Sequence, residues 1–412
     1  MDIFQETIEY DSKKVYQVQA LYNKQSTCEF VLQPEKDFIM PMDIYLNFSV
    51  EIKGNYLMDN QADKLFDSVE VIVANEKVTS RSNSGEYFLS SFFRTKANHP
   101  RDHFSTQLVP SGWYGNENAN TGLILTSIEK AAKDDKKSII VQKRDGYPKM
   151  KGDKVDSRIY TFSMQIQSPL FQQAQPLPSN VTVHINFKRA KANLAVILID
   201  DSTDKYYDKH WIPLINPYLE VTALRSDKLA KKYNFLTSDI INYPIEQNVI
   251  RTHTIDTGNN HVDFSVTTGG HLPKMIFAAL VKPEAFQGDE TLSATCFERH
   301  DLTKFELSLN NNIISGSQVH VSDQNLVEAY TKFFRQCKMI PNSYAGSIMY
   351  PIEFHTYNFM MAYDLTSIEQ KTGWLNVLMD FKANLASKLM LIVYMVFDKE
   401  ITIDSNRNVT IN

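Results

Sequence analysis

Apolar residues alternate with polar ones over many short stretches of the chain, which is the pattern of half-buried β-strands. In the first half, the stretches that predict strands are 27–32, 43–52, 68–74, 158–167, 180–188, 194–199 and 218–224. In the second half, they are 249–255, 262–266, 274–281, 304–309, 354–363, 375–381, 388–397 and 400–403. Few helical patterns interrupt them. We therefore expect an all-β protein with a few short helices in its loops.

Four sequence blocks of the first half recur, in the same order, in the second half. The pairs are 69–75 with 305–311, 92–94 with 333–335, 160–164 with 357–361, and 184–188 with 378–382. The first pair reads as a strand that ends in an Asn-containing turn. The second pair, Phe-Phe-Arg in both copies, reads as a short aromatic helix that follows a capping signature at Asn83 or Asn325. Four blocks in one order indicate an internal duplication.

The spacing of the blocks locates one large insertion. The first two pairs are separated by 236 and 241 residues, and the last two by 197 and 194. The drop of 44 residues places an insertion of that size between Arg94 and Tyr160. Segment 110–155 is rich in lysine, and loops of this length are usually functional or disordered. We expect a solvated surface projection, and a loop that binds an anionic partner is the alternative.

The length of 412 residues and the duplication predict two domains. Seven or eight strands per half, joined by long, irregular loops instead of two-residue hairpins, favour Greek-key sandwiches of the jelly-roll type. The expected fold is two tandem eight-stranded jelly rolls. Residues 1–225 form the first jelly roll, 226–245 a linker, and 246–412 the second jelly roll.

Composition narrows the function. A net charge of −5 gives no reason to expect a surface that binds nucleic acid. Cys28, Cys296 and Cys337 show no metal-site spacing, so we expect reduced thiols. The N-terminal residues lack the basic and apolar regions of a signal peptide, and the longest apolar run, 389–397, is about half a membrane span. We expect a soluble protein made in a reducing compartment, with no insertion into membranes.

Two clusters of polar residues invite a chemical interpretation. The acidic stretch 200–204, with Asp208 and His210, lacks the glycine and glutamate of an EF-hand loop. His253, His261 and His271 are spaced more widely than the usual zinc ligands. No nucleophile elbow, P-loop or dinucleotide-binding glycine motif occurs. We therefore predict no catalytic, cofactor-binding or metal-binding residues and no enzyme activity, although carboxylate pairs of the glycosidase kind carry no local signature.

The second half also resembles a known family. The segments that carry the resemblance are 270–281 with its Leu-Pro-Lys start, 285–288, Phe297, 301–302, 326–334 around Ala329-Tyr330, and 359–366 with its Asp-Leu-Thr end. They are similar to the major capsid proteins of Polinton/Maverick elements and adintoviruses. The resemblance is ordered across about 244–366 and weaker in the first half. Segment 110–155 and the tail beyond Trp374 depart from the family pattern.

The resemblance implies a double jelly-roll hexon of the adenovirus and tectivirus lineage. Such a chain forms a pseudo-hexagonal homotrimer that tiles an icosahedral virion shell, beside a single jelly-roll penton and minor capsid proteins. The chain would be made in the host cytoplasm and assembled in the cytoplasm or nucleus. Two alternatives stay open: a cytoplasmic double β-sandwich that binds a ligand, and a glycan-cleaving enzyme on the same architecture.

Overall fold

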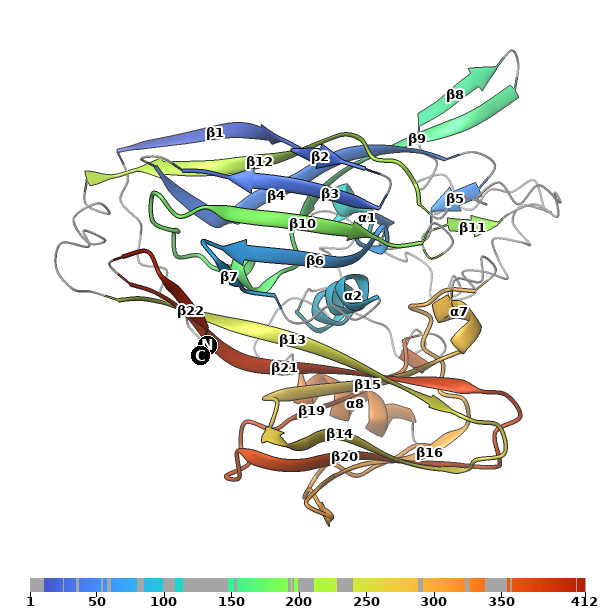
Figure 1. Ribbon diagram of the computed structural model, residues 1–412. Helices are drawn as coiled ribbons and strands as arrows, with labels where there is room; N and C mark the ends of the chain where they lie inside the picture. Colours follow the sequence, from blue (N-terminus) through green and yellow to red (C-terminus); the bar gives the residue numbers. More distant parts are fainter. Residues whose placement is uncertain are drawn as a thin grey trace.

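A computed structural model shows two β-sandwiches, one below the other, with most of their strands running from side to side in the view of Figure 1. The described residues are 11–24, 26–34, 37–52, 55–57, 61–79, 85–98, 108–113, 147–151, 154–191, 194, 196–198, 211–227, 240–287, 292–322, 326–337, 354–355, 358–404 and 406–411.

The first sandwich consists of two five-stranded antiparallel sheets. One sheet, which we call sheet A, has the order β1 (Ser12–Gln19), β12 (Ile215–Arg225), β4 (Phe38–Ile52), β9 (Lys154–Gln165) and β8 (Tyr147–Lys151). The other, sheet B, has the order β2 (Tyr22–Asn23), β3 (Thr27–Leu32), β10 (Val183–Arg189), β6 (Phe66–Val73) and β7 (Glu76–Lys77). A small ladder pairs β5 (Asn55–Leu57) with β11 (Val196–Leu198).

The second sandwich repeats this arrangement. Its sheet D has the order β13 (Ile241–Ile255), β21 (Leu389–Ile403), β15 (Met275–Val281) and β19 (Met360–Asp364), and β22 (Val409–Ile411) extends β21. Its sheet E has the order β14 (His261–His271), β20 (Thr372–Phe381), β16 (Leu302–Leu309) and β17 (Asn312–Ile313), and β18 (Val319–His320) pairs with β16. The strand order matches the first sandwich strand for strand, from β1-β12-β4-β9 to β13-β21-β15-β19 and from β3-β10-β6-β7 to β14-β20-β16-β17.

The four repeated blocks fall on these equivalent elements. They lie on β6 and β16, on helices α2 (Glu86–Asn98) and α8 (Leu326–Gln336), on β9 and near the start of β19, and on β10 and β20. The prediction of an all-β fold made of two jelly rolls is therefore confirmed. The expectation of long loops throughout does not hold, because β6 and β16 each enter their partner strand through a two-residue turn, at Ala74-Asn75 and Asn310-Asn311.

Backbone geometry explains the conserved position of these turns. Ala74, Asn310 and Asn311 have positive φ angles of 53°, 51° and 67°. Asparagine tolerates this left-handed conformation better than most residues because its side chain can bond to nearby backbone. This accounts for Asn310-Asn311 in the second copy, whereas in the first copy the residue in the left-handed conformation is Ala74 and not Asn75.

Short helices occupy the loops. Among the described residues these are, besides α2 and α8, α1 (Gln61–Lys64), α7 (Pro283–Gln287) and the 3₁₀ turns η1 (Val109–Ser111) and η3 (Pro169–Gln172). Helix α1 follows β4 and β5, and α7 follows β15, which is the strand equivalent to β4. These two helices therefore also occupy related positions. In Figure 1, α2 lies between the two sandwiches.

The domain boundaries stay a proposal, with one adjustment near the junction. Strand β13 begins at Ile241, inside the segment 226–245 that we expected to be a linker, and it pairs with β21 from Ile241 to Ile255. Of the expected insertion 110–155, the structure describes 110–113, β8, and the start of β9. The rest of that segment lies outside the described residues.

Candidate functional site

The contact between the two jelly rolls brings together buried aromatic rings and charged side chains, and α2 forms its centre. The helix belongs to the first jelly roll, yet Phe88, Leu89, Phe92 and Phe93 are buried in the core of the second. Core side chains normally pack within the domain to which they belong. Here a helix of one domain completes the core of the other.

Phe93 is held between aromatic rings of the second jelly roll. Its ring stacks on Tyr394 of β21, with 5.2 Å between centroids and 9° between planes, and on Phe297, at 5.4 Å and 12°. Phe277 of β15 lies 6.0 Å away. Phe92 meets Phe297 edge to face at 5.4 Å. Such pairs add about 0.5–1.5 kcal/mol each beyond the burial of their area.

The second jelly roll contributes to the first core in return. Ile241, Tyr243 and Ile245, from the start of β13, are buried with the residues of the first jelly roll, together with Ile401 and Ile403 from the end of β21. These strands run beyond their own sandwich and pass beneath the other (Figure 1). The two cores are therefore interlocked.

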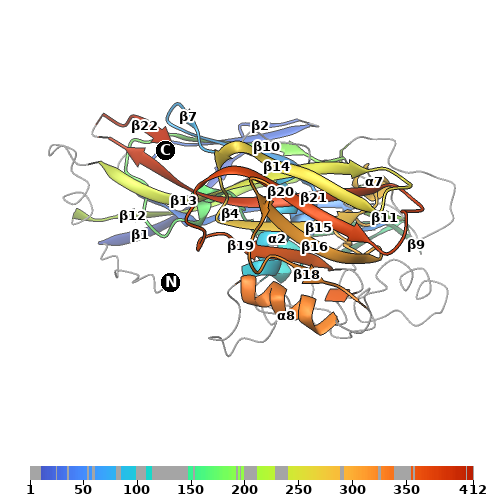
Figure 2. The same ribbon diagram turned by 90° about the horizontal axis from the view of Figure 1, so that it is seen from below.

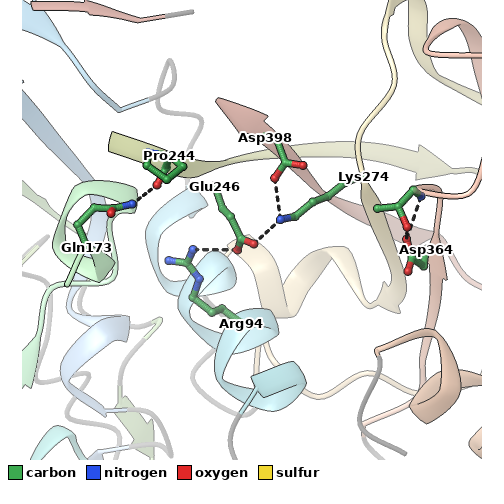
Figure 3. Close-up of polar contacts among 8 residues, drawn as sticks. Arg94, Gln173, Pro244, Glu246, Lys274, Asp364 and Asp398 are labelled. Carbon is green, nitrogen blue, oxygen red and sulfur yellow. Dashed lines mark hydrogen bonds and ion pairs between the residues drawn. The ribbon is translucent and has the colours of Figure 1, made fainter. Parts of the chain in front are cut away.

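Hydrogen bonds fix this extension of β13. The hydroxyl of Tyr243 donates to the carbonyl oxygen of Pro176 at 2.9 Å, and the side-chain amide of Gln173 donates to the carbonyl oxygen of Pro244 (Figure 3). On the first jelly roll, Gln173 and Pro176 both lie shortly after η3.

A chain of charges joins the jelly rolls next to the aromatic contact. Arg94 of α2 lies 3.8 Å from the Glu246 carboxylate, and the ammonium group of Lys274 contacts both Glu246 and Asp398, the latter at 2.7 Å (Figure 3). Burial lowers the pKa of Lys274, but hydrogen bonds to Asp398 and Glu246 outweigh this effect and raise it overall. The side chain of Arg94 is only 6% exposed, so its positive charge is balanced mainly by the Glu246 carboxylate across the interface and not by solvent.

Asp63 is a fully buried carboxyl close to the same helix. The hydroxyl of Ser91, on α2, donates to its Oδ2 atom at 2.7 Å. Burial raises the pKa of Asp63 to about 7, against the opposing effect of hydrogen bonds from Ser91, Tyr87 and Trp113. The neighbouring Lys64 is also buried, and its Nζ atom donates to Ser293 of the second jelly roll at 3.4 Å. These groups tie α1 and α2 to the junction.

The polar residues that the sequence singled out do not converge. His253 stacks on Phe264 at 4.7 Å, His261 at the start of β14 lies 2.6 Å from Asp380, and His271 ends β14. The acidic stretch 200–204, with Asp208 and His210, lies outside the described residues. Among the residues that are described, no three His, Cys, Asp or Glu side chains are placed to hold a metal ion.

The three cysteines are free thiols. Cys28 is fully buried, and burial raises its pKa and that of Cys296 to about 12, while the pKa of Cys337 is raised further. A thiol with a raised pKa is a poor nucleophile at neutral pH. In the part of the chain that the structure describes, no helix is long and apolar enough to cross a membrane.

One small pocket opens beside the junction, lined by Ser68, Glu86, Tyr87, Gln167 and Asn248 among others. Of these, Glu86 and Tyr87 start α2, and Asn248 comes from β13, so the pocket also lies where the jelly rolls meet. Burial raises the pKa of Tyr87 well above its usual value, so its hydroxyl stays protonated. The pocket is a gap between packed elements.

Sequence reasoning missed the role of α2, although a signal for it was present. Strands β15 and β21 contain the continuous apolar runs 275–281 and 389–397, where a half-buried strand would alternate. Such runs indicate strands that are buried on both faces. Another element of the protein must therefore cover the outer face of sheet D, and the structure shows that α2 covers it.

Comparison with family models and with curated proteins gives no match for this chain. Solved structures match over its whole length. A chain of the Sputnik virophage structure has a TM-score of 0.63 at 10% identity and covers 100% of this chain and 91% of its own. VP54 of the virus PBCV-1 has a TM-score of 0.60 at 11% identity and covers 99% of both chains. The mavirus major capsid protein has a TM-score of 0.56 at 9% identity and covers 99% of this chain and 93% of its own.

These three matched chains are viral capsid proteins of the double jelly-roll type. At identities near 10%, the likeness shows a shared fold. It covers both jelly rolls and the junction between them, in the same order along the chain.

Proposed function

We propose that this chain is the major capsid protein of a virus, and that three copies form a capsomer that tiles an icosahedral shell. The observation that carries the proposal is the match of both jelly rolls, over 99–100% of this chain, to capsid proteins of three viruses. A shared single sandwich would be weak support, because common folds host many functions. A match that spans two sandwiches in tandem is a far more specific arrangement.

The duplication supplies a physical reason for a trimer. Each chain presents two sandwiches with the same strand order. Three such chains around a threefold axis present six similar sandwiches, and this trimer fits a lattice position with six neighbours. A protein without the duplication would need six chains for the same position.

The resemblance to the Polinton/Maverick and adintovirus capsid proteins refines the proposal. On this basis the proposal is a protein of the hexon lineage, with a single jelly-roll penton and minor capsid proteins as partners and the virion as its location. In this role the chain has no catalytic, cofactor-binding or metal-binding residues. The junction described above is then a structural device that holds the two jelly rolls at a constant angle.

Light scattering coupled to size-exclusion chromatography tests the proposal on the purified full chain. We expect a species of three times the chain mass of 47.3 kDa. Electron microscopy of the same sample should show particles with a pseudo-hexagonal outline. A chain that stays monomeric at high concentration would contradict the proposal and favour the alternative of a ligand-binding double sandwich.

A further inference from the structure

One side of helix α2 is polar and buried, although the rest of its contact with the second jelly roll is aromatic. Glu86, Ser90 and Arg94 follow one another at intervals of four residues, so they share one face of the helix, and all three are buried. Strand β13 places Glu246 and Asn248 against this face. We call these five residues the polar seam. Strands of the second jelly roll pass in front of α2 in Figure 2.

The small pocket beside the junction lies within the polar seam. Its volume is about 40 Å³, and its lining combines α2, Asn248 of β13, and Ser168, which precedes η3. Apart from Val69 and Pro169, the residues that line it carry polar side chains. A cavity of this volume has room for about two or three water molecules. The pocket is thus large enough and polar enough to hold water.

Two side chains that line the pocket have buried polar atoms without a hydrogen-bond partner in the part of the chain that the structure describes. They are Oγ of Ser168 and Oδ1 of Asn248, in residues that are 2% and 7% exposed. Burying such an atom unpaired is unfavourable, and native proteins pair nearly all of them with protein groups or with ordered water. One of the two atoms belongs to the first jelly roll and the other to the second.

The backbone around Ser168 explains why its hydroxyl is left over. Ser168 stands at the N-cap position of η3, where a serine side chain usually accepts from a backbone N–H of the first turn. Among the described residues, its hydroxyl makes no such bond. The backbone groups of Ser168 are engaged, because its N–H donates to Ile166 at 2.9 Å and its carbonyl accepts from Phe171 at 3.0 Å. The hydroxyl therefore needs a partner from the pocket.

We propose that this pocket is a binding site for about two or three ordered water molecules, which bridge the jelly rolls from Ser168 to Asn248. Water fits both ends of the bridge. It donates to Oδ1 of Asn248, which can only accept, and it can either donate to or accept from the hydroxyl of Ser168. The site lies within one chain, so it does not depend on the proposed capsid role.

The chemistry of the lining favours water over a metal ion. Calcium sites combine six to eight oxygen ligands, often from several carboxylates. Among the residues that line this pocket, Glu86 alone carries a carboxylate. The hydroxyl of Tyr87 accepts from the N–H of Gln167 at 3.2 Å, and burial raises the pKa of Tyr87 well above its usual value. Tyr87 therefore adds no second negative charge.

Arg94 shows the same need for water one turn beyond Ser90. Within the described part of the chain, its Nη1 and Nη2 atoms are buried and donate to no acceptor. Nη2 lies 3.8 Å from Oε2 of Glu246, which is too far for a direct hydrogen bond (Figure 3). A water molecule that accepts from Arg94 and donates to Glu246 completes this contact. Water then serves the polar seam along its length.

A crystal or electron microscopy structure of the full chain, at a resolution that shows ordered water, tests the site directly. We expect discrete density peaks in the pocket, at about 2.7–3.2 Å from Oδ1 of Asn248 and Oγ of Ser168. A pocket without density would overturn the proposal. A single peak with six or more oxygen ligands at about 2.3–2.6 Å would overturn it as well, because that geometry belongs to a bound cation.

The substitution Ser168→Ala gives a second measurement whose sign separates a wet pocket from a dry one. If water bridges the pocket, the variant loses a hydrogen bond, and we expect its thermal midpoint to fall by about 1–3 °C. In a dry pocket the change removes an unpaired buried hydroxyl, so a midpoint that stays the same or rises would overturn the proposal. Ser317→Ala sets the scale, because the hydroxyl of Ser317 bonds to both backbone groups of Leu307.

Exchange of ions in the buffer separates water from a cation in solution. Replacing sodium chloride by choline chloride at equal ionic strength, with a chelator of divalent ions added, should leave the thermal midpoint of the native chain unchanged. A fall in this midpoint that is abolished in Ser168→Ala would assign the pocket to a cation and overturn the proposal.

Discussion

At the scale of single residues, Asp63 shows how the junction constrains chemistry. Burial raises its pKa to about 7, from about 3.8 in an unfolded chain. Between these values the unfolded chain releases the proton that the folded chain still holds. Stability from this group is therefore greatest below about pH 4, falls as the pH rises towards 7, and is constant above that.

The substitution Asp63→Asn should remove this pH dependence. We expect the variant to match the native chain near pH 4 and to exceed its free energy of unfolding by about 2–4 kcal/mol near pH 8. Denaturant unfolding at a series of pH values measures the difference. Asp256→Asn, at an exposed ion pair with Lys388, serves as the control and should show no such trend. Equal stability of Asp63→Asn and the native chain at pH 8 would contradict the argument.

Gly373 illustrates a steric constraint at one residue. A Cβ atom there would lie 2.7 Å from Cδ1 of Leu309 and 3.0 Å from Oδ1 of Asn310. Two hydrogen bonds of 2.9 Å hold Asn310 in place. The backbone N–H of Trp374 donates to Oδ1 of Asn310, and the backbone N–H of Asn310 donates to the backbone carbonyl of Trp374. The repeated turn thus packs directly on β20.

We expect Gly373→Ala to destabilise the protein by about 1–3 kcal/mol, because overpacking forces its neighbours to shift. Gly270→Ala should change stability by less than about 0.5 kcal/mol, since a Cβ atom there meets nothing within 4 Å. Thermal unfolding of both variants measures the contrast. Similar thermal unfolding midpoints for the two variants would show that Leu309 and Asn310 can move to accommodate the added methyl group.

At the scale of elements, α2 and α8 separate what duplication preserves from what it changes. The sequence repeat predicted both helices and their place between strands, and the structure agrees. The sequences of the two helices do not indicate which jelly-roll core each helix enters. Phe93 packs on rings of the other jelly roll, while Phe333 and Phe334 pack with Phe354 and Tyr330 of their own.

This difference predicts distinct effects of equivalent substitutions. Phe93→Ala should lower hydrogen-exchange protection in β15 and β21 of the second jelly roll as well as in β6 of the first, at a cost of about 3–5 kcal/mol. Phe334→Ala should lower protection in the second jelly roll and leave β6 unchanged. Hydrogen exchange read by mass spectrometry resolves these strands. Protection that changes identically in both variants would show that α2 does not couple the jelly rolls.

Strand ends show where sequence patterns stop being informative. The prediction started a strand at 249, whereas β13 starts at Ile241. Residues 241–245 do alternate, but Pro244 and the charged stretch before it suggested a linker. Their apolar side chains are matched to the first core, which a local pattern cannot reveal. Strand β1 was missed for a similar reason, because its lysines and glutamines mask the inward-facing Tyr16 and Val18.

At the scale of the whole molecule, the interlocked cores predict that neither jelly roll is independent. A fragment of residues 240–412 would expose Phe277, Tyr394 and Ile250 to water, because α2 would be absent. We expect this fragment alone to aggregate, and fragment 1–239 to lack the residues of β13 that complete its core.

Expression of the two fragments, alone and together, measures this dependence. Soluble material should appear when both are present, as a complex with the circular dichroism spectrum of the intact chain. A soluble, cooperatively folding 240–412 fragment would contradict the interlocked description. The sequence predicted two domains but not this dependence, because periodicity reports which face of a strand is buried and not which partner buries it.

The equivalent strands β4 and β15 carry a consequence for how the repeated sheet is used. The outer face of sheet D, with Phe277, Tyr394 and Ile250, leaves water as soon as a single chain folds. The outer face of sheet A, with Glu220 and Gln17 beside Tyr45, stays in contact with water in the folded chain. Duplication thus supplied one sheet twice, and one copy closes the molecule while the other forms part of its surface.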